Sequence, residues 1–142
     1  MDIKQNKSIG LTITHTANLL NNSINKKIKP YDIAIEQRAI LEIIHTQGEI
    51  KQIELCNILE KDKTTISRTL KTLEGKKYIK RIKVDNKTQK FILSELGKKV
   101  FEETKSLVDD FRAKIIDIFD DKEIENLYEY LDKISTVIKK NN

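Results

Sequence analysis

Residues 52–96, QIELCNILEKDKTTISRTLKTLEGKKYIKRIKVDNKTQKFILSEL, decide the fold of this chain. Their apolar spacing predicts a short helix over 52–59, a tight turn, and a second helix over 63–76. Two runs rich in β-branched residues, 78–84 and 89–93, are separated by four residues of turn composition and predict a β-hairpin. This order predicts a winged helix-turn-helix, whose second helix and hairpin tip are separate devices for gripping duplex DNA.

The second of these helices has an apolar and a polar face. Ile66, Leu70 and Leu73 follow at steps of four and three and are expected to face inward. Asp62 precedes the helix and is a good N-cap, because its carboxylate can accept from the free amides of the first turn. The residues expected to contact DNA lie on the polar face and the hairpin, and are Lys63, Thr64, Thr65, Ser67, Arg68, Lys71, Lys87 and Lys90.

We expect these residues to make contacts of different kinds with DNA. Arg68 could read guanine through a bidentate pair, the commonest base-specific contact, or could hold a phosphate or a neighbouring carboxylate. The hydroxyl groups beside it can reach phosphates or base edges, although Thr65 could instead serve the helix cap. Lys71 is expected to touch the DNA backbone, and Lys87 and Lys90 to follow the phosphates, unless they belong to a merely solvated face.

Positive charge is concentrated in the same stretch. Residues 61–90 contain 11 lysines and arginines against 3 acidic residues, whereas residues 1–60 are balanced and residues 91–142 are slightly acidic. The whole chain has a formal net charge of +5. A basic block between neutral and acidic flanks is an electrostatic footprint for phosphate, and a solvated lysine-rich surface is the alternative.

Two helices are predicted before this block. A long helix begins after Ser8 and is ended by Pro30, because the residue before proline disfavours α geometry. A second helix is predicted over about 33–46 and is stopped by Gly48, and residues 49–51 could form one short strand. The residues expected to face inward from this second helix are Ile33, Ile40, Leu41 and Ile44.

Two more helices are predicted after the hairpin. Ser94 is expected to cap the first, whose apolar residues are Leu96, Val100, Leu107, Phe111, Ile115 and Ile118. The second starts at Asp120 or Asp121, and its apolar stripe from Ile124 to Ile138 is a heptad seam that requires a partner helix. We expect a homodimer held by the first helix and by both helices after the hairpin, with Ile9, Ile13, Leu20, Leu127, Leu131, Ile134 and Ile138 at the interface.

Composition limits the class of protein. The length of 142 residues is that of one domain, and residues 1–7 are polar and expected to be frayed. The single cysteine permits no intramolecular disulfide, and neither an export signal nor an apolar run of membrane-spanning length is present. We therefore expect a cytoplasmic protein without a membrane partner.

Three phrases resemble the MarR family of bacterial transcription regulators. They are IAIEQRAIL at 33–41, ELCNILEKDKTTISRTLKTLE at 54–74 and KKYIKRIKVDNKTQKFILSELGKK at 76–99. Each phrase alone is weak, but their order and spacing together are fairly specific. The sequence departs from the family pattern where Ala34 replaces a capping threonine, Lys77 a glycine and Lys87 a wing-tip arginine. Lysine keeps the charge but lacks the guanidinium fork, so the wing could enter a minor groove or only touch phosphate.

The resemblance implies a mainly α (α+β) fold, a winged helix-turn-helix with long terminal dimerisation helices. It implies a single domain over 1–142, with a DNA-binding lobe over 33–96 and dimerisation helices over 8–30 and 97–140. It also implies operator DNA bound by the helix over 63–76 and by the wing, often with release by a small molecule or an oxidant. The effector and its pocket residues are not indicated by the sequence.

Other chemistry is poorly supported. Cys56 could be a redox switch, but it falls on the inner side of its helix, where a buried thiol is inert. His15 and His45 lack the spacing of metal ligands, and no cofactor is expected. No nucleophile motif, phosphate-binding glycine loop or carboxylate pair indicates an enzyme. The sequence thus predicts a dimeric regulator, expected to be a repressor, on a pseudo-palindromic operator; the alternative is a winged-helix module that binds protein without specific DNA binding.

Overall fold

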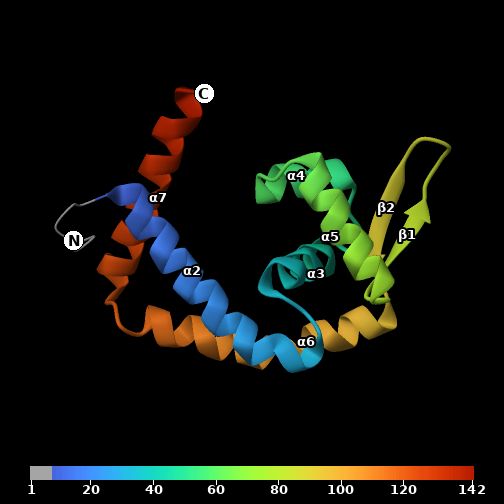
Figure 1. Cartoon of the computed structure of the whole chain (residues 1–142), viewed down its shortest axis with the longest axis horizontal. Helices are drawn as coiled ribbons and strands as arrows, with labels where there is room; N and C mark the ends of the chain where they lie inside the picture. The colour runs from blue at the N-terminus through green and yellow to red at the C-terminus, as the bar shows by residue number, and fades with distance from the viewer. Residues whose placement is uncertain (1–7) are drawn as a thin grey trace. The chain divides into compact units, whose positions relative to one another are not determined.

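The computed structural model describes residues 8–142, so the fraying expected for residues 1–7 lies outside it. The chain divides into two compact units, the first running to Leu107 and the second from Val108 to Asn142. The whole winged helix falls within the first unit. Its helices α3 (Ile35–Gln47), α4 (Gln52–Leu59) and α5 (Lys63–Gly75) gather together, and the hairpin of β1 (Ile79–Lys83) and β2 (Gln89–Leu93) rises to the right of α5 in this view (Figure 1).

Helix α2 (Ile9–Ile28) begins as predicted, because the Ser8 hydroxyl accepts a hydrogen bond from the Leu11 amide at 3.3 Å. It ends where Pro30 enters a short 3-10 helix, η1 (Lys29–Tyr31). Its buried residues, both at its C-terminal end, are Ile24 and Ile28.

Helix α3 (Ile35–Gln47) starts two residues later than predicted. The helix starts late because the chain turns at Asp32, whose φ of 52° is left-handed. Ala34, which has an extended backbone, is the N-cap. Alanine has no side-chain oxygen, so only the reciprocal half of a cap forms, in which Gln37 Oε1 accepts from the Ala34 amide at 3.1 Å. Gly48 ends the helix with a φ of 85°, as predicted.

One apolar core joins the elements of the first unit, because α3 and α4 (Gln52–Leu59) both pack on the hairpin and α4 also packs on α5 (Lys63–Gly75). The four residues expected to face inward near α3 are buried, as are the three expected on α5. The buried apolar residues in and next to these elements include Ile33, Ile40, Leu41, Ile44, Ile50, Leu55, Ile66, Leu70, Leu73, Ile79, Phe91 and Leu93.

A charged side chain also lies in this core. Arg38 has an exposed fraction of 2 % and joins α3 to α6 (Glu95–Ile116). Its guanidinium donates to Thr104 Oγ1 at 2.7 Å and to the Phe101 carbonyl at 3.3 Å, and lies 4.7 Å from the centre of the Phe101 ring. A buried charge must be hydrogen-bonded to be tolerated, and these contacts meet that requirement.

The wing is an antiparallel hairpin of β1 (Ile79–Lys83) and β2 (Gln89–Leu93). The short strand expected over 49–51 is reduced to a single bridge, in which Ile50 and Phe91 exchange backbone hydrogen bonds of 3.1 and 2.8 Å. One bridging residue suffices to fix the root of the wing beside α4.

Helix α6 is capped as predicted, because the Ser94 hydroxyl accepts from the Gly97 amide at 2.9 Å. Of the apolar residues named for this helix, Val100 is buried, whereas Leu96 is exposed and Ile118 lies beyond the helix end with an exposed fraction of 73 %. In the first unit the helix also buries Phe101 and Thr104. Gly97 meets the hairpin so closely that a Cβ there would lie 1.9 Å from the Tyr78 carbonyl oxygen.

The second unit contains helix α7 (Asp121–Lys140), which starts as predicted with a reciprocal cap between Asp120 and Glu123. Its heptad seam is not buried within the single chain, since Leu127, Leu131 and Ile138 all stay exposed. None of the helices formed by residues 8–142 combines the length and the hydrophobicity that a membrane span requires.

Candidate nucleic-acid interface

The turn between α4 and α5 sets the angle of the second helix. Glu60 ends α4 in a left-handed conformation, with a φ of 52°, and the Lys61 amide donates to the Cys56 carbonyl at 3.2 Å. Asp62 then caps α5 as predicted, because its Oδ1 accepts from the Thr65 amide at 2.7 Å. That hydrogen bond is the main cause that lowers the pKa of the Asp62 carboxyl below its usual value, and Arg68 adds to the effect.

The outward face of α5 is a shallow groove of about 390 Å³. The groove brings together five of the residues predicted to contact DNA, which are Lys63, Thr64, Ser67, Arg68 and Lys71. Thr65 is exposed at the start of the helix but does not line the groove, and its amide serves the cap. Within the described chain, no ion pair of 4 Å or less occupies Lys63, Arg68 or Lys71.

The wing tip is shaped by one carboxylate. Asp85 Oδ1 accepts from the Lys87 amide at 2.8 Å and from the Thr88 amide at 2.7 Å. These two bonds lower the pKa of the Asp85 carboxyl and present the exposed Lys87 side chain at the end of the hairpin. Lys90 is already engaged, since its Nζ lies 2.6 Å from Glu49 Oε1, which raises the Lys90 pKa.

The wing is tied to α5 by a pair that the sequence did not predict. The Arg81 guanidinium makes two bonds to the Glu74 carboxylate, at 2.6 and 3.3 Å, and a third to Gln89 Oε1 at 2.6 Å. It also lies 5.0 Å from the centre of the Phe91 ring. A bidentate arginine–carboxylate pair fixes orientation as well as distance. The signal in the sequence was Glu74, the only glutamate in the basic block.

All three acidic residues of the basic block form hydrogen bonds or ion pairs that stabilise the local structure. Asp62 caps α5, Glu74 holds Arg81, and Asp85 forms the wing turn. These carboxylates keep their negative charge, but the 11 basic residues of the block outnumber them. The block is therefore a positive surface, which favours the phosphate footprint over a merely solvated face.

Cys56 is placed differently from the prediction. It is half-buried rather than shielded, and it lines a cleft of about 450 Å³ between α4 and the wing. Lys51, Lys63 and Lys87 line the same cleft. The prediction failed because α4 has only about two turns, and the side of it that carries Cys56 borders the cleft beside the hairpin.

The histidines were considered as metal ligands. His45 stacks on the Phe101 ring, with 4.4 Å between the ring centres. Residues 8–142 hold no group of three or more potential metal-ligating side chains.

The comparisons with known proteins agree with this geometry. The MarR family model matches residues 33–90. Residues 33–90 belong to the MarR family. This MarR-family segment covers the α3–wing lobe and includes every residue predicted to contact DNA. The predicted family and the predicted mainly α winged-helix fold are thereby confirmed.

Relatives extend the likeness beyond the MarR-family segment. The chain is 25 % identical over 114 residues to the uncharacterized HTH-type transcriptional regulator YwoH of Bacillus subtilis (strain 168), covering 80 % of this chain and 83 % of YwoH. It resembles MepR in an S. aureus MepR–DNA complex, with a TM-score of 0.85, 22 % identity and coverage of 92 % and 96 %. It also resembles a mutant E. coli MarR complexed with operator DNA, with a TM-score of 0.83, 22 % identity and coverage of 94 % and 99 %.

Proposed function

We propose that this chain is a sequence-specific DNA-binding transcription regulator that acts as a homodimer on a pseudo-palindromic operator. The observation that carries the proposal is the outward face of α5, where hydroxyl and basic side chains without carboxylate partners lie in one groove of a MarR-family lobe. MepR and MarR, which share the fold, have been crystallised with DNA. We expect repression rather than activation, a cytoplasmic location and a binding rather than a catalytic role.

The DNA contacts divide by position. Arg68 lies in the middle of the exposed face of α5 and reads a base edge in the major groove. The wing-tip Lys87 touches phosphate, as do Lys63 and Lys71. The hydroxyl residues Thr64, Thr65 and Ser67 bond to phosphates or base edges. Lys90 contributes only if it exchanges Glu49 for the DNA backbone, because its ammonium is already paired.

The dimer is formed by the helices outside the lobe. We place the DNA-binding lobe at 33–96 and the dimerisation helices at 8–30 and 97–140, within one functional domain over 1–142. The support is the exposure of the apolar seam residues in the single chain, among them Ile9 with 61 % of its surface exposed. Large exposed apolar patches mark interaction sites. The interface residues are Ile9, Ile13, Leu20, Leu127, Leu131, Ile134 and Ile138.

The test begins with selection of bound genomic fragments, followed by salt-titrated gel shifts on the selected operator and on random duplex. We expect two half-sites whose centres lie about one helical turn, roughly 10 base pairs, apart. Inserting about 5 base pairs between them would turn the half-sites to opposite faces of the duplex and should abolish tight binding. If no duplex is preferred over random DNA, or if the spacer has no effect, the proposal is wrong, and binding of a protein partner becomes the remaining function of the lobe.

A further inference from the structure

The cleft of about 450 Å³ between α4 and the wing is lined by three lysines from three segments. We call it the wing cleft. Lys51 comes from the N-cap of α4, Lys63 from the start of α5 and Lys87 from the wing tip. Its carboxamide lining residues are Gln52, Asn86 and Gln89. All of these residues belong to the first compact unit, so the site needs no partner subunit.

The positive charge of the wing cleft is not balanced by its own lining. Among residues 8–142, no carboxylate lines the cleft, and none of the three lysines has an ion pair of 4 Å or less. Asp85 stands beside the wing tip, but its Oδ1 accepts from the Lys87 and Thr88 amides at 2.8 and 2.7 Å. A cleft lined by one sign of charge focuses the electric field and concentrates counter-ions. The wing cleft therefore favours an anionic ligand.

The walls of the wing cleft are held in place without a ligand. Gln52 Nε2 donates to the Lys63 carbonyl at 3.3 Å and so joins the start of α4 to the start of α5. The backbone bridge between Ile50 and Phe91 fixes the root of the wing beside them. A site that is already formed binds its ligand at a lower cost in ordering.

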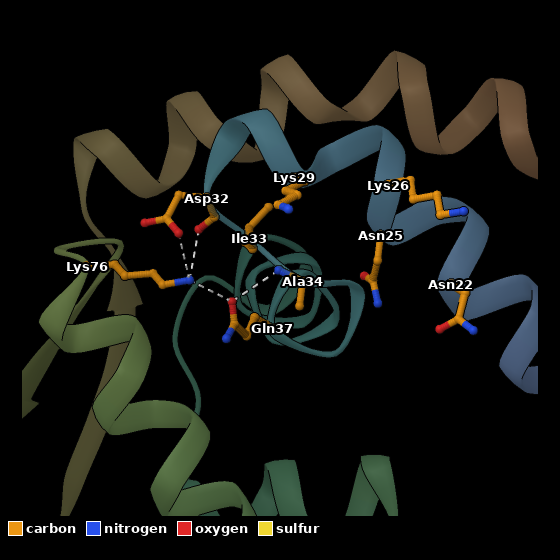
Figure 2. Close-up of a pocket in the computed structure, with 9 residues that line it drawn as sticks. All are labelled: Asn22, Asn25, Lys26, Lys29, Asp32, Ile33, Ala34, Gln37 and Lys76. Atoms are coloured by element: carbon orange, nitrogen blue, oxygen red, sulfur yellow. Dashed lines mark hydrogen bonds and ion pairs between the residues drawn. The ribbon is translucent and has the colours of Figure 1, made fainter.

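A second cleft provides a contrast of similar size. It has a volume of about 540 Å³ and is lined from α2, η1, the start of α3 and Lys76 at the end of α5. It also contains three lysines, but Figure 2 shows Lys76 reaching across to Asp32 and Gln37. Lys76 Nζ donates to the Asp32 carbonyl at 2.9 Å and lies 3.4 Å from Asp32 Oδ1. Part of the positive charge in this second cleft is therefore balanced by a carboxylate of its own lining.

We propose that the wing cleft binds a chain of phosphate groups, and that a free polyphosphate therefore competes with the operator backbone for it. The competition rests on the proposed function, which already assigns phosphate contacts to Lys63 and Lys87. Lys51 is the added contact. Three ammonium groups from three segments suit a chain of phosphates better than a single phosphate, because each can meet a different group. Lysine binds phosphate as a point charge, so the backbone of DNA and a free chain can use the same site.

The first experiment measures binding without DNA. We would titrate the ¹⁵N-labelled full chain with tripolyphosphate, at constant ionic strength and without divalent cations, and follow side-chain amide signals. The wing-cleft signals should shift to saturation and the second-cleft signals should stay in place, while inorganic phosphate should bind more weakly. The signals are those of Gln52, Asn86 and Gln89 in the wing cleft and of Asn22, Asn25 and Gln37 in the second cleft.

Two variants locate the site. Lys51→Met should weaken tripolyphosphate binding about fivefold, the effect of losing one exposed ion pair. Lys26→Met removes a lysine from the second cleft and is the matched control, so it should bind tripolyphosphate as the wild type does.

The second experiment measures competition with the operator. At ten times its dissociation constant, tripolyphosphate should lower operator affinity about tenfold in the wild type and about threefold in Lys51→Met, as competition for one site requires. Sodium chloride at the same ionic strength controls for screening. Without tripolyphosphate, Lys51→Met should reduce the slope of log operator affinity against log salt by about one unit per monomer, because the operator backbone then loses one contact.

The outcomes separate this proposal from the proposed function. Equal shifts of the amide signals in both clefts, or equal weakening by Lys51→Met and Lys26→Met, would overturn the wing cleft as a phosphate site. Saturable binding that leaves operator affinity unchanged, or an unaltered salt slope in Lys51→Met, would overturn the shared use of the cleft by DNA. Failure of the ligand-free protein to prefer any duplex would instead count against the proposed function and leave the amide titration standing.

Discussion

Lys77 joins α5 to the wing in a conformation that suits glycine. Its φ of 68° is left-handed, and its carbonyl accepts from the Ser94 hydroxyl, so the backbone cannot relax without losing that bond. A side chain in this region costs about 1 kcal/mol or more. We predict that Lys77→Gly raises the free energy of unfolding by about 1 kcal/mol, measured as a shift of the urea midpoint at constant slope.

The control for this change is Lys80→Gly on β1. Lys80 lies in regular strand backbone, so glycine there gives up strand conformation without relieving any strain and should destabilise the fold. A lower midpoint for Lys77→Gly would contradict the assignment of strain to Lys77.

Arg68 and Lys87 should differ in the kind of DNA contact that they make. Arg68→Ala should cost about 1–3 kcal/mol on the specific operator and flatten the preference for it, because base readout is lost. Lys87→Ala should weaken all duplexes alike and reduce the slope of log affinity against log salt by about one unit per monomer. The measurement is affinity against salt for operator and random duplex, and a change of sequence preference in Lys87→Ala with an intact slope would refute the distinction.

At the scale of an element, α5 depends on the Asp62 cap in a manner that varies with pH. The pKa of Asp62 is lowered in the fold, so its charge contributes stability that is present above its usual value of 3.8 and is lost as pH falls through the folded value. Asparagine caps helices about as well but does not titrate. The advantage of wild type over Asp62→Asn in unfolding free energy should therefore be constant near neutral pH and shrink below about pH 4. A difference that grows on acidification would show that the cap does not act through the ionised form.

The wing should be positioned by the pair between Glu74 and Arg81. Both side chains are partly exposed, so breaking the pair should cost the fold only about 0.5–1 kcal/mol. Operator binding should suffer more, because the wing can then swing relative to α5. We predict that Glu74→Gln and Arg81→Gln weaken binding to similar extents and that the double variant is no weaker than either. Additive losses in this double-mutant cycle would mean that each residue acts alone.

The features that the sequence predicted well are those that depend on near neighbours. Local hydrogen bonds and backbone angles account for the start of α2 after Ser8, the caps at Asp62 and Ser94, and the stop at Gly48. The inward face of α5 follows from apolar spacing. These rules place the groove on α5 correctly but do not test which of its residues touch DNA.

The features that the sequence missed depend on approaches between distant segments. Gly97 on α6 approaches the Tyr78 carbonyl closely, and no spacing rule predicts this contact. The burial of Arg38 could not be predicted, because its partners Phe101 and Thr104 are more than 60 positions away in the sequence. The exposure of Cys56 and the pairing of Lys90 with Glu49 likewise depend on where the hairpin lies.

For the whole molecule, the decisive prediction concerns the seam of α7. Leu131 is exposed in the single chain, and in the proposed dimer it would be buried, where a charge is strongly destabilising. Leu131→Glu should therefore convert the dimer to monomer at micromolar concentration and abolish operator binding. Thr136→Glu adds the same charge to α7 away from the seam and should remain dimeric. Sedimentation of both variants measures this, and a monomeric wild type would show the dimer itself to be wrong.

The left-handed residues at the ends of η1, α4 and α5 bear on how the chain evolved. Asp32, Glu60 and Lys77 each adopt this conformation without being glycine, whereas Gly48 is the one glycine of the described chain with a positive φ. Each position is a single substitution away from a more relaxed backbone, so the sequence lies below the greatest stability its fold allows. Natural proteins are held above a threshold rather than at an optimum, because selection removes only changes that fall below it. Substitutions that relax these three helix ends could compensate for later, mildly destabilising changes on the outward face of α5. That face is where a new operator preference would have to arise.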